Sequence, residues 1–389
     1  MATIKVDCIA YPAAPEDVFK RGEKILHEKL PALKFETSKA NPEILFILTG
    51  GSEYEAKMVV DNLKYVLILA MNENNSYAAA TEIKAYCNQN NIVSILINID
   101  TEENLSRLIE YYLCSKQAIS KIKKYKLGLL GNISKWLIAS DIQGNVLKSK
   151  FDIELVKIDW ESHEQYSEFE INNQFITHFN NSDGIDLKDS SKVYNLIEHI
   201  INDNKLDAIT VECFPMVREH AVTACLALSK LNNDLFPAGC EGDLTAITGM
   251  IIAKELVGQV PWMANLVSIN KNTVFLAHCT IATNLVSKYK IATHFETNSG
   301  TAVQGIFEAN EITIFRFDKN LEKAFIGTGI VTSKPDRSDA CRTQIEVELP
   351  NNSIELLNEQ PLGNHHLILP GRFKDILEFF CKLKQIKVI

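Results

Sequence analysis

Short apolar runs that alternate with segments of helical periodicity constrain the fold of this chain more than any other feature. Between residues 1 and 122 the runs 4–10, 43–48, 65–70 and 92–99 are separated by stretches of helix length. Strands that are apolar throughout and joined by helices predict a parallel sheet covered on both faces. Ligands of such sheets bind beyond the carboxyl ends of the strands.

The same opening repeats after residue 122. Residues 126–131, KLGLLG, read as a strand followed by a turn, and residues 208–211 read as a later strand. The glycines of LGLLGN do not have the GxGxxG spacing, so we expect no dinucleotide site. From about Gly258 onward, strands follow one another at close spacing, and the last helix is expected at 373–384. Close strands without long helices between them indicate an antiparallel sheet or barrel.

The predicted fold is therefore α/β, with two doubly wound parallel-sheet domains followed by a mostly antiparallel β domain. We place the N-terminal domain at residues 1–122, the second α/β domain at 123–257 and the C-terminal β-rich domain at 258–389. A chain of 389 residues is too long for one ordinary core, which agrees with several domains.

The stretch 236–265, FPAGCEGDLTAITGMIIAKELVGQVPWMAN, holds the first candidate site. Asp243 stands at the N-cap position of an apolar helix over 244–257, and Gly258 stands where that helix would stop. A carboxylate at a helix N-terminus tends to remain ionised, so Glu241 and Asp243 together suit a metal or proton-transfer site. The simpler alternative is that Asp243 only caps the helix and Glu241 faces solvent.

Composition excludes several classes of function. A net charge of −9 and a pI near 5.6 argue against a nucleic-acid binder, and no apolar run is long enough for a membrane span. The opening MATIKVDCIAYPAAP lacks the pattern of a signal peptide, and the nine cysteines form no CxxC pair. We therefore expect a cytoplasmic protein with buried free thiols and no structural zinc site.

Three imidazoles extend the list of candidate ligands. His278 ends the apolar run VFLAHC, and His365 and His366 lie together in GNHHLIL. A carboxylate with two imidazoles makes an open site suited to Mn²⁺ or a similar divalent ion. A lone histidine in an apolar run, such as His278, is more often a hydrogen-bonded core residue, and the pair is equally compatible with a turn.

The order of these motifs resembles the L-fucose/L-arabinose isomerase family of aldose–ketose isomerases. The likeness rests on CEGD before a helix, then PWMANLVS, AHC, THFETNSGTAVQG, CRTQIEV and GNHHLIL. TGGSE, NSYAAATEIKAY and KLGLLGNISKWLIAS look like the two N-terminal domains of that family. The chain is shorter than the founding isomerases and is similar to their compact relatives.

The resemblance implies roles for individual residues. Glu241 matches the metal-binding glutamate of the family, and Asn265 falls where the family has its second acidic ligand. His278 resembles a histidine ligand of the arabinose branch. His365 matches the C-terminal histidine ligand, with His366 as the alternative register.

Asn265 is the departure from the family. The two acidic residues of the family bind the metal and move a proton between C1 and C2 of the sugar through an enediol. An amide can offer its oxygen to a metal but cannot accept a proton at neutral pH. Asp243 or Glu212 could replace the missing base, although their simpler roles are helix cap and exposed turn residue.

Substrate contacts are the least constrained part of the prediction. Arg342 in CRTQ could hold an anionic or hydroxyl group, or form a salt bridge at a strand edge. Trp136 could stack on a sugar face or belong to the core. His366 would contact the substrate if His365 binds the metal.

Three hypotheses follow. The first is a cytoplasmic, manganese-dependent aldose–ketose isomerase, which by the resemblance would form a homotrimer or homohexamer. The second is a non-catalytic or repurposed sugar binder that lost the second acidic residue at Asn265. The third, a periplasmic-type binding module, is disfavoured by the missing signal peptide and the free thiols. In the first two hypotheses the partner is a small sugar, and neither involves nucleic acid or membrane.

Overall fold

The computed structural model describes residues 3–160, 165–179 and 184–389, and the chain divides into two compact units. The first unit comprises Met1–Lys116 and the second Gln117–Ile389. The boundary falls within helix α4, Leu105–Ile122.

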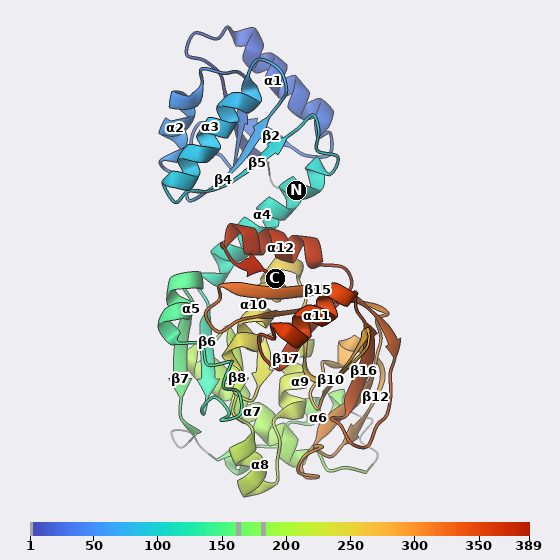
Figure 1. Ribbon diagram of the computed structural model, residues 1–389. Helices are drawn as coiled ribbons and strands as arrows, with labels where there is room; N and C mark the ends of the chain where they lie inside the picture. The colour runs from blue at the N-terminus through green and yellow to red at the C-terminus, as the bar shows by residue number, and fades with distance from the viewer. Residues whose placement is uncertain (1–2, 161–164, 180–183) are drawn as a thin grey trace. The chain divides into compact units, whose positions relative to one another are not determined.

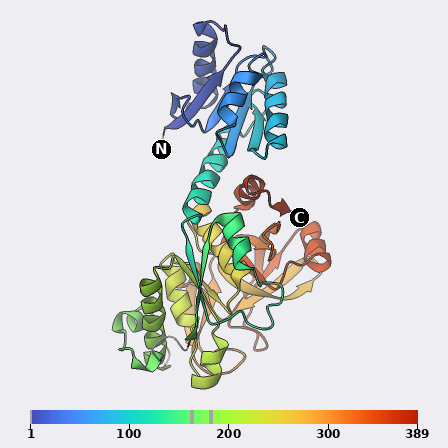
Figure 2. The same cartoon turned by 90° about the vertical axis from the view of Figure 1, so that its left-hand side faces the viewer.

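The first unit is built on a five-stranded parallel sheet in the order β2-β1-β3-β4-β5. Strands β3 and β4 are apolar and buried along nearly their whole length, as a sheet covered on both faces requires. Helix α1 covers one face and α2 and α3 cover the other (Figures 1 and 2). The bounds are β1 Ile4–Ile9, α1 Glu16–Lys29, β2 Phe35–Thr37, β3 Ile44–Ile47, α2 Glu53–Val60, β4 Tyr65–Ala70, α3 Ser76–Gln89 and β5 Val93–Asn98.

The second unit opens with a four-stranded parallel sheet in the order β7-β6-β8-β9. The strands are β6 Lys126–Leu130, β7 Glu154–Ile158, β8 Ala208–Val211 and β9 Ala238–Cys240. The helices between them are α5 Gly144–Phe151, η2 Tyr166–Glu168, α6 Asn173–His178, α7 Lys188–Asn204, α8 Phe214–His220 and α9 Cys225–Asn233.

An antiparallel barrel completes the second unit. Its strands follow the order β14-β17-β10-β11-β16-β15, and pairing between β14 and β15 closes the ring. The bounds are β10 Trp262–Asn270, β11 Thr273–His278, β14 Glu311–Phe317, β15 Lys323–Ser333, β16 Thr343–Glu348 and β17 His365–Pro370. The remaining elements are η3 Thr283–Leu285, the hairpin β12 Val286–Ala292 and β13 Ala302–Phe307, α11 Asn351–Glu359, α12 Lys374–Leu383 and β18 Lys387–Val388.

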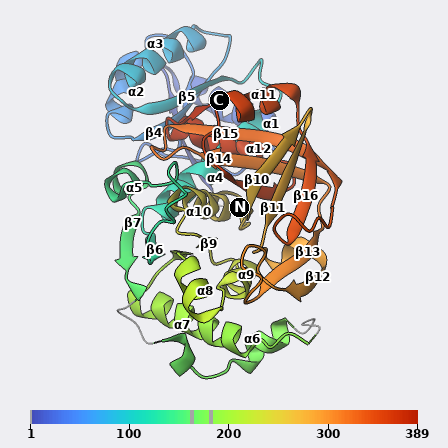
Figure 3. The same cartoon turned by 60° about the horizontal axis from the view of Figure 1, so that its bottom comes forward.

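Helix α10, Leu244–Val257, lies between the parallel sheet and the barrel of the second unit (Figure 3). It packs against β8 and β9 on one side and against β14 and β17 on the other. Eleven of its fourteen residues are buried, which explains why its sequence is apolar around the whole circumference. Gly249 marks the closest approach, because a Cβ there would collide with Leu367 of the barrel.

The predicted fold class is confirmed, and the expected antiparallel sheet or barrel is a closed barrel. Asp243 caps α10 as predicted, by accepting a hydrogen bond from the Ala246 N–H, and Gly258 ends the helix in the left-handed region. Strands β12 and β13 and helix α11 were not expected. Two lysines interrupt the apolar residues of β12, Gln304 and Gly305 interrupt those of β13, and α11 begins with two asparagines. The division into three domains remains a prediction.

Two expectations from composition can be compared with the structure. Eight of the nine cysteines are buried and all are free, and only Cys114 is exposed. Within the part of the chain that the structure describes, no helix has the length and apolar character needed to cross a membrane.

Candidate active site

Glu241 lies at the carboxyl end of β9, where its own backbone is strained. Its φ of 62° is in the left-handed region, and Gly242 follows with a φ of 70°. The Ser134 N–H donates to the Glu241 carbonyl at 3.0 Å, and Gly242 packs on the backbone of Asn132. Non-glycine residues in this region cost of order 1–3 kcal/mol, and such strain concentrates at functional sites. The turn aims the Glu241 carboxylate toward the barrel.

Side chains from three separate elements meet at this carboxylate. Glu241 Oε1 lies 3.7 Å from His365 Nε2 at the start of β17 and 4.0 Å from His278 Nε2 at the end of β11. The two imidazole rings are 5.6 Å apart between centroids. The three side chains are 13%, 1% and 5% exposed, in the order Glu241, His365, His278. The structure therefore brings together residues that are far apart in the sequence.

His365 is held in an orientation that leaves one nitrogen available. Its Nδ1 lies 2.9 Å from Asp243 Oδ2, and this carboxylate is fully buried. An ionised carboxylate accepts the Nδ1 proton, so the lone pair of the neutral ring is on Nε2. His365 Nε2 is buried, has no hydrogen-bond partner and faces Glu241. A carboxylate that orients a histidine in this way is the usual arrangement behind a metal-bound imidazole.

Arg316 on β14 is a second cation beside the Asp243 carboxylate. The guanidinium is 1% exposed, its Nη1 lies 3.7 Å from Asp243 Oδ2, and it donates to the His365 carbonyl and, at 2.8 Å, to Ser140 Oγ. We did not expect this residue from the sequence. The signal was present, because an arginine inside the apolar run EITIFRF must be paired if that run is buried.

The pKa values of Glu241, His365 and His278 are strongly shifted from their ordinary values. Burial would raise the pKa of Glu241, but the neighbouring His365 and His278 rings and the hydrogen bond from Trp136 outweigh it and lower the pKa to about 2. Burial would lower the pKa of His365, but Asp243 and Glu241 raise it to about 9. Burial and the neighbouring His365 lower the pKa of His278 to about 3. Without a metal, Glu241 is therefore ionised, His365 protonated and His278 neutral at pH 7.

His278 and His365 differ in the role of Nδ1, which accepts a hydrogen bond in His278 and donates one in His365. Its Nδ1 accepts a hydrogen bond from the Thr280 N–H at 3.2 Å, so the neutral ring carries its proton on Nε2. In this orientation His278 donates toward Glu241. A role as metal ligand through Nε2 requires the contact with Thr280 to be lost.

Cys240, which precedes Glu241, was not among the sequence candidates. The ligand atoms of Cys240, Glu241 and His278 all lie within 4.8 Å of one another, which makes them a possible metal-binding group. However, Cys240 Sγ is 3.4 Å from Cys213 Sγ, and this contact and burial raise the pKa of Cys240 well above its ordinary value. A neutral thiol is a poor ligand, so Glu241 and His365 remain the best-prepared pair.

Asn265 lies beside the cluster, on strand β10. It is paired with His365 in the antiparallel register of β10 and β17, which puts the two side chains on one face of the sheet. The Asn265 Oδ1 accepts a hydrogen bond from Asn364 Nδ2 at 2.6 Å.

The two residues proposed to replace the missing base already have hydrogen-bond partners. Glu212 accepts from the Asn132 N–H at 2.7 Å. Asp243 is committed to His365 and to its helix cap.

The three predicted substrate contacts lie in different surroundings. Trp136 is 54% exposed and donates its Nε1–H to Glu241 Oε2 at 2.5 Å, so it is a surface residue at the candidate site. His366 is 1% exposed and faces Phe325, with its Nδ1 bonded to the Asn364 carbonyl. Arg342 donates to the carbonyl and the hydroxyl of Thr293 at 2.6 and 3.0 Å. Trp136 therefore contacts Glu241, whereas the His366 side chain faces Phe325.

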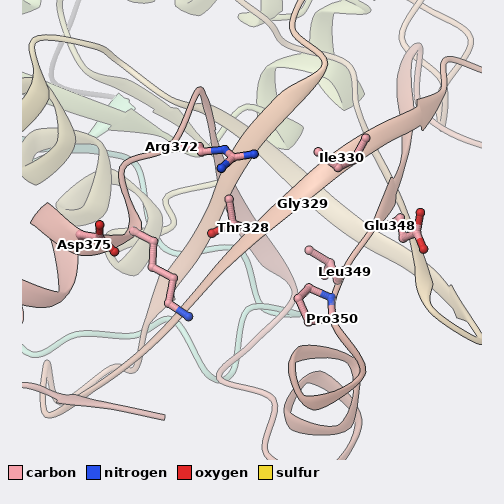
Figure 4. A pocket seen from close by; sticks show the side chains of 9 residues that line it. Thr328, Gly329, Ile330, Glu348, Leu349, Pro350, Arg372 and Asp375 are labelled. Atoms are coloured by element: carbon pink, nitrogen blue, oxygen red, sulfur yellow. The ribbon is translucent and has the colours of Figure 1, made fainter.

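A larger cavity lies apart from these residues, beside β15 and the start of α12. It has a volume of about 590 Å³ and is lined by Thr328, Glu348, Leu349, Arg372 and Asp375, among others (Figure 4). A separate void beside His278 and Cys240 measures about 10 Å³, too small for a sugar. Any substrate of the Glu241 cluster must therefore approach from the open side, where Trp136 is exposed.

Comparison with known proteins gives one partial similarity and no family assignment. A segment of 200 residues is 22% identical to a sulfoquinovose isomerase from Clostridium sp. (strain MSTE9), and it covers 48% of this chain and 44% of that protein. No family model matches the chain. The similarity is thus to a sugar isomerase, over less than half the length of either protein.

Proposed function

We propose that this protein is a divalent-metal-dependent sugar isomerase that interconverts an aldose and a ketose. The observation that carries the proposal is the arrangement of Asp243, His365 and Glu241. A buried nitrogen without a partner, oriented by one carboxylate, faces a second carboxylate that is ionised. The partial similarity to a sugar isomerase independently supports this class of reaction.

The donor set fits a divalent cation. Glu241 supplies a carboxylate and His365 an imidazole nitrogen, and His278 would join them on losing its contact with Thr280. When bound, the metal would supply Lewis-acid polarisation of the carbonyl and hydroxyl oxygens of the sugar. Oxygen and imidazole ligands are compatible with Mn²⁺.

The protein's own side chains would perform the remaining tasks. Trp136 presents an exposed indole next to Glu241, on which a sugar ring can pack, while its N–H holds the carboxylate. Glu241 is the one ionised carboxylate of the cluster that is not fully buried, so we assign to it the proton transfer between C1 and C2. Asp243 positions His365 and does not reach the substrate.

A second candidate function rests on Asn265. Its amide cannot act as a base, and loss of a positioned base costs about 10²- to 10⁴-fold in rate. If Glu241 cannot work alone, the chain is a sugar binder that retains the fold without the turnover. The hydrogen bond from Asn364 to Asn265 favours this alternative, because it occupies the amide oxygen of Asn265, the atom that would otherwise bind a metal.

The two functions are distinguished by activity assays on the native protein and on Asn265→Asp. Purified protein with Mn²⁺ is tested against a panel of aldoses and ketoses that includes sulfoquinovose, and sugar-dependent thermal shifts are recorded in parallel. Turnover by the native protein supports the isomerase. Thermal shifts without turnover, together with activity gained in Asn265→Asp, support the binder. If no sugar of the panel gives turnover or a thermal shift, both functions are contradicted.

Assembly and location remain proposals that follow from the same assignment. We propose a cytoplasmic homotrimer or homohexamer in which a neighbouring copy helps to enclose the open side of the site. Sedimentation at several protein concentrations measures the oligomer, and a monomer under assay conditions would contradict it.

A further inference from the structure

A second group of potential ligands lies outside the cluster around Glu241. The sulfur atoms of Cys279 and Cys341 and a carboxylate oxygen of Glu296 all lie within 4.8 Å of one another. Both cysteines are buried, at 2% and 7% exposure, and the side chain of Glu296 is 42% exposed. We refer to these three residues as the thiol cluster.

The thiol cluster joins two barrel strands to a loop. Cys279 directly follows the end of β11, and Cys341 lies just before β16, which pairs with β11 through His278 and Thr343. Glu296 belongs to the loop between β12 and β13. The cluster therefore lies where the ends of two paired strands meet a connection that has no regular structure of its own.

The separations fit a tetrahedral zinc ion. Zinc–sulfur bonds of about 2.3 Å and zinc–oxygen bonds of about 2.0 Å put sulfur and oxygen roughly 3.5 Å apart at a tetrahedral angle. Cys341 Sγ lies 3.5 Å from Glu296 Oε1. Two sulfurs with one carboxylate favour zinc over magnesium, calcium or manganese, because thiolates are soft ligands.

Glu296 is oriented for this role by His294. The His294 Nε2 lies 3.0 Å from Glu296 Oε2, and its Nδ1 lies 3.1 Å from Thr297 Oγ1. One carboxylate oxygen is thus held by an imidazole, while the other faces Cys341. Outer contacts of this kind are characteristic of metal-ligating carboxylates.

We propose that Cys279, Cys341 and Glu296 bind Zn²⁺ or a similarly thiophilic divalent cation, with a fourth position open on the exposed side of Glu296. Binding ties the loop that carries His294 to the ends of β11 and β16. The loop reaches the candidate active site through ring contacts from His294 to Phe214 and from Phe214 to Trp136. The proposal stands independently of the sugar isomerase activity.

Cobalt provides the direct test. Metal-free, fully reduced protein is titrated with Co²⁺, and thiolate coordination is detected by the sulfur-to-cobalt charge-transfer absorption in the near ultraviolet. We expect this band to appear and to disappear when Zn²⁺ is added. Absence of the band, or a band that Zn²⁺ does not displace, would overturn the proposal.

Variants locate the ion. Cys341→Ser should lose the band, whereas Cys240→Ser and Glu241→Gln should keep it, because they belong to the other cluster. Cys114→Ser, at the one exposed cysteine, is the matched control. If Cys341→Ser does not fold, Glu296→Gln on the exposed side serves instead, with Zn²⁺ affinity reduced roughly tenfold in competition with a chromophoric chelator. A band lost in Cys240→Ser, or an unchanged Zn²⁺ affinity in Glu296→Gln, would contradict the assignment.

Discussion

The two ends of the barrel differ in how their charged groups are satisfied. At the end where β17 begins, Glu241 Oε1 lies 3.7 Å from His365 Nε2 and 4.0 Å from His278 Nε2, and all three side chains are largely buried. At the end where β17 finishes, a cavity of about 590 Å³ is lined by Arg372, Glu348 and Asp375 (Figure 4). There Arg372 is paired with Glu311, and Glu348 accepts from Asn272 at 2.6 Å.

Under the proposed function the chemistry takes place at the small cluster and not in the large cavity, so volume alone would be a poor guide to the active site. At the large cavity, Arg372 is 70% exposed and is paired with Glu311. The small cluster has buried charges, strained backbone and one nitrogen without a partner. Shifted pKa values at buried, convergent groups mark functional sites more reliably than size does.

The largest expected effect contrasts one carboxyl group at each end. Glu241→Gln should lower isomerase activity by about 10²- to 10⁴-fold, because it removes both the base and a charged ligand. Asp375→Asn at the large cavity should leave activity within error. Initial rates on the best sugar of the panel, with saturating Mn²⁺, measure both. Equal losses in the two variants would mean that the chemistry has been assigned to the wrong end.

The two arginines allow a comparison of stability. Arg316→Met should reduce the free energy of unfolding by about 3–5 kcal/mol, because it removes one of the two cations, Arg316 and His365, that offset the buried Asp243 charge. Arg372→Met should leave the free energy of unfolding nearly unchanged, since the Arg372 side chain is 70% exposed in its pair with Glu311. Denaturant unfolding of the second unit measures the difference. Comparable losses would show that Arg316 is not the group that compensates Asp243.

A pH effect should appear at the Glu241 end in the absence of metal. The folded pKa of His365, about 9, lies above the unfolded value of 6.5, so its contribution is full below pH 6.5 and lost as the pH rises through 9. The loss amounts to roughly 3 kcal/mol at most. The melting temperature in chelator should fall over this range, and His365→Gln should remove the fall. Unchanged melting of the native protein between pH 6.5 and 9 would contradict the assignment.

The smallest effect concerns the residue behind the histidine. Asp243→Asn keeps an effective N-cap, but it exchanges the buried carboxylate for a neutral amide. We expect Mn²⁺ affinity to fall about 10- to 100-fold, as for other changes behind metal-bound histidines. Calorimetric titration measures the affinity, with Asp375→Asn as the matched substitution. An unaltered Mn²⁺ affinity would mean that Asp243 acts only as the cap of α10.

The sequence was informative where a local pattern has a single physical solution. The α10 boundaries followed from Asp243 and Gly258, because a cap and a left-handed stop are strong signals. The alternation of apolar runs predicted both parallel sheets. The choice between His365 and His366 stayed open, since adjacent strand residues face opposite sides and only the register with β10 decides which side meets Glu241.

Other features could not be predicted because they depend on distant contacts. The state of His278 is set by its bond from the Thr280 N–H, and that of His365 by Asp243 from another element. Cys279 and Cys341 are far apart in the sequence and form no recognisable ligand spacing, so we expected no zinc site from them. Their proximity follows from the pairing of β11 with β16.

Helix α10 has a consequence for how the second unit can be divided. Because one face packs on β8 and β9 and the other on β14 and β17, the parallel sheet and the barrel share it as a common core. A fragment that ends at residue 257 would leave a continuous apolar surface of α10 in water, and such fragments aggregate. A chimera that joins the barrel to another parallel sheet should therefore fold only if it also includes helix α10.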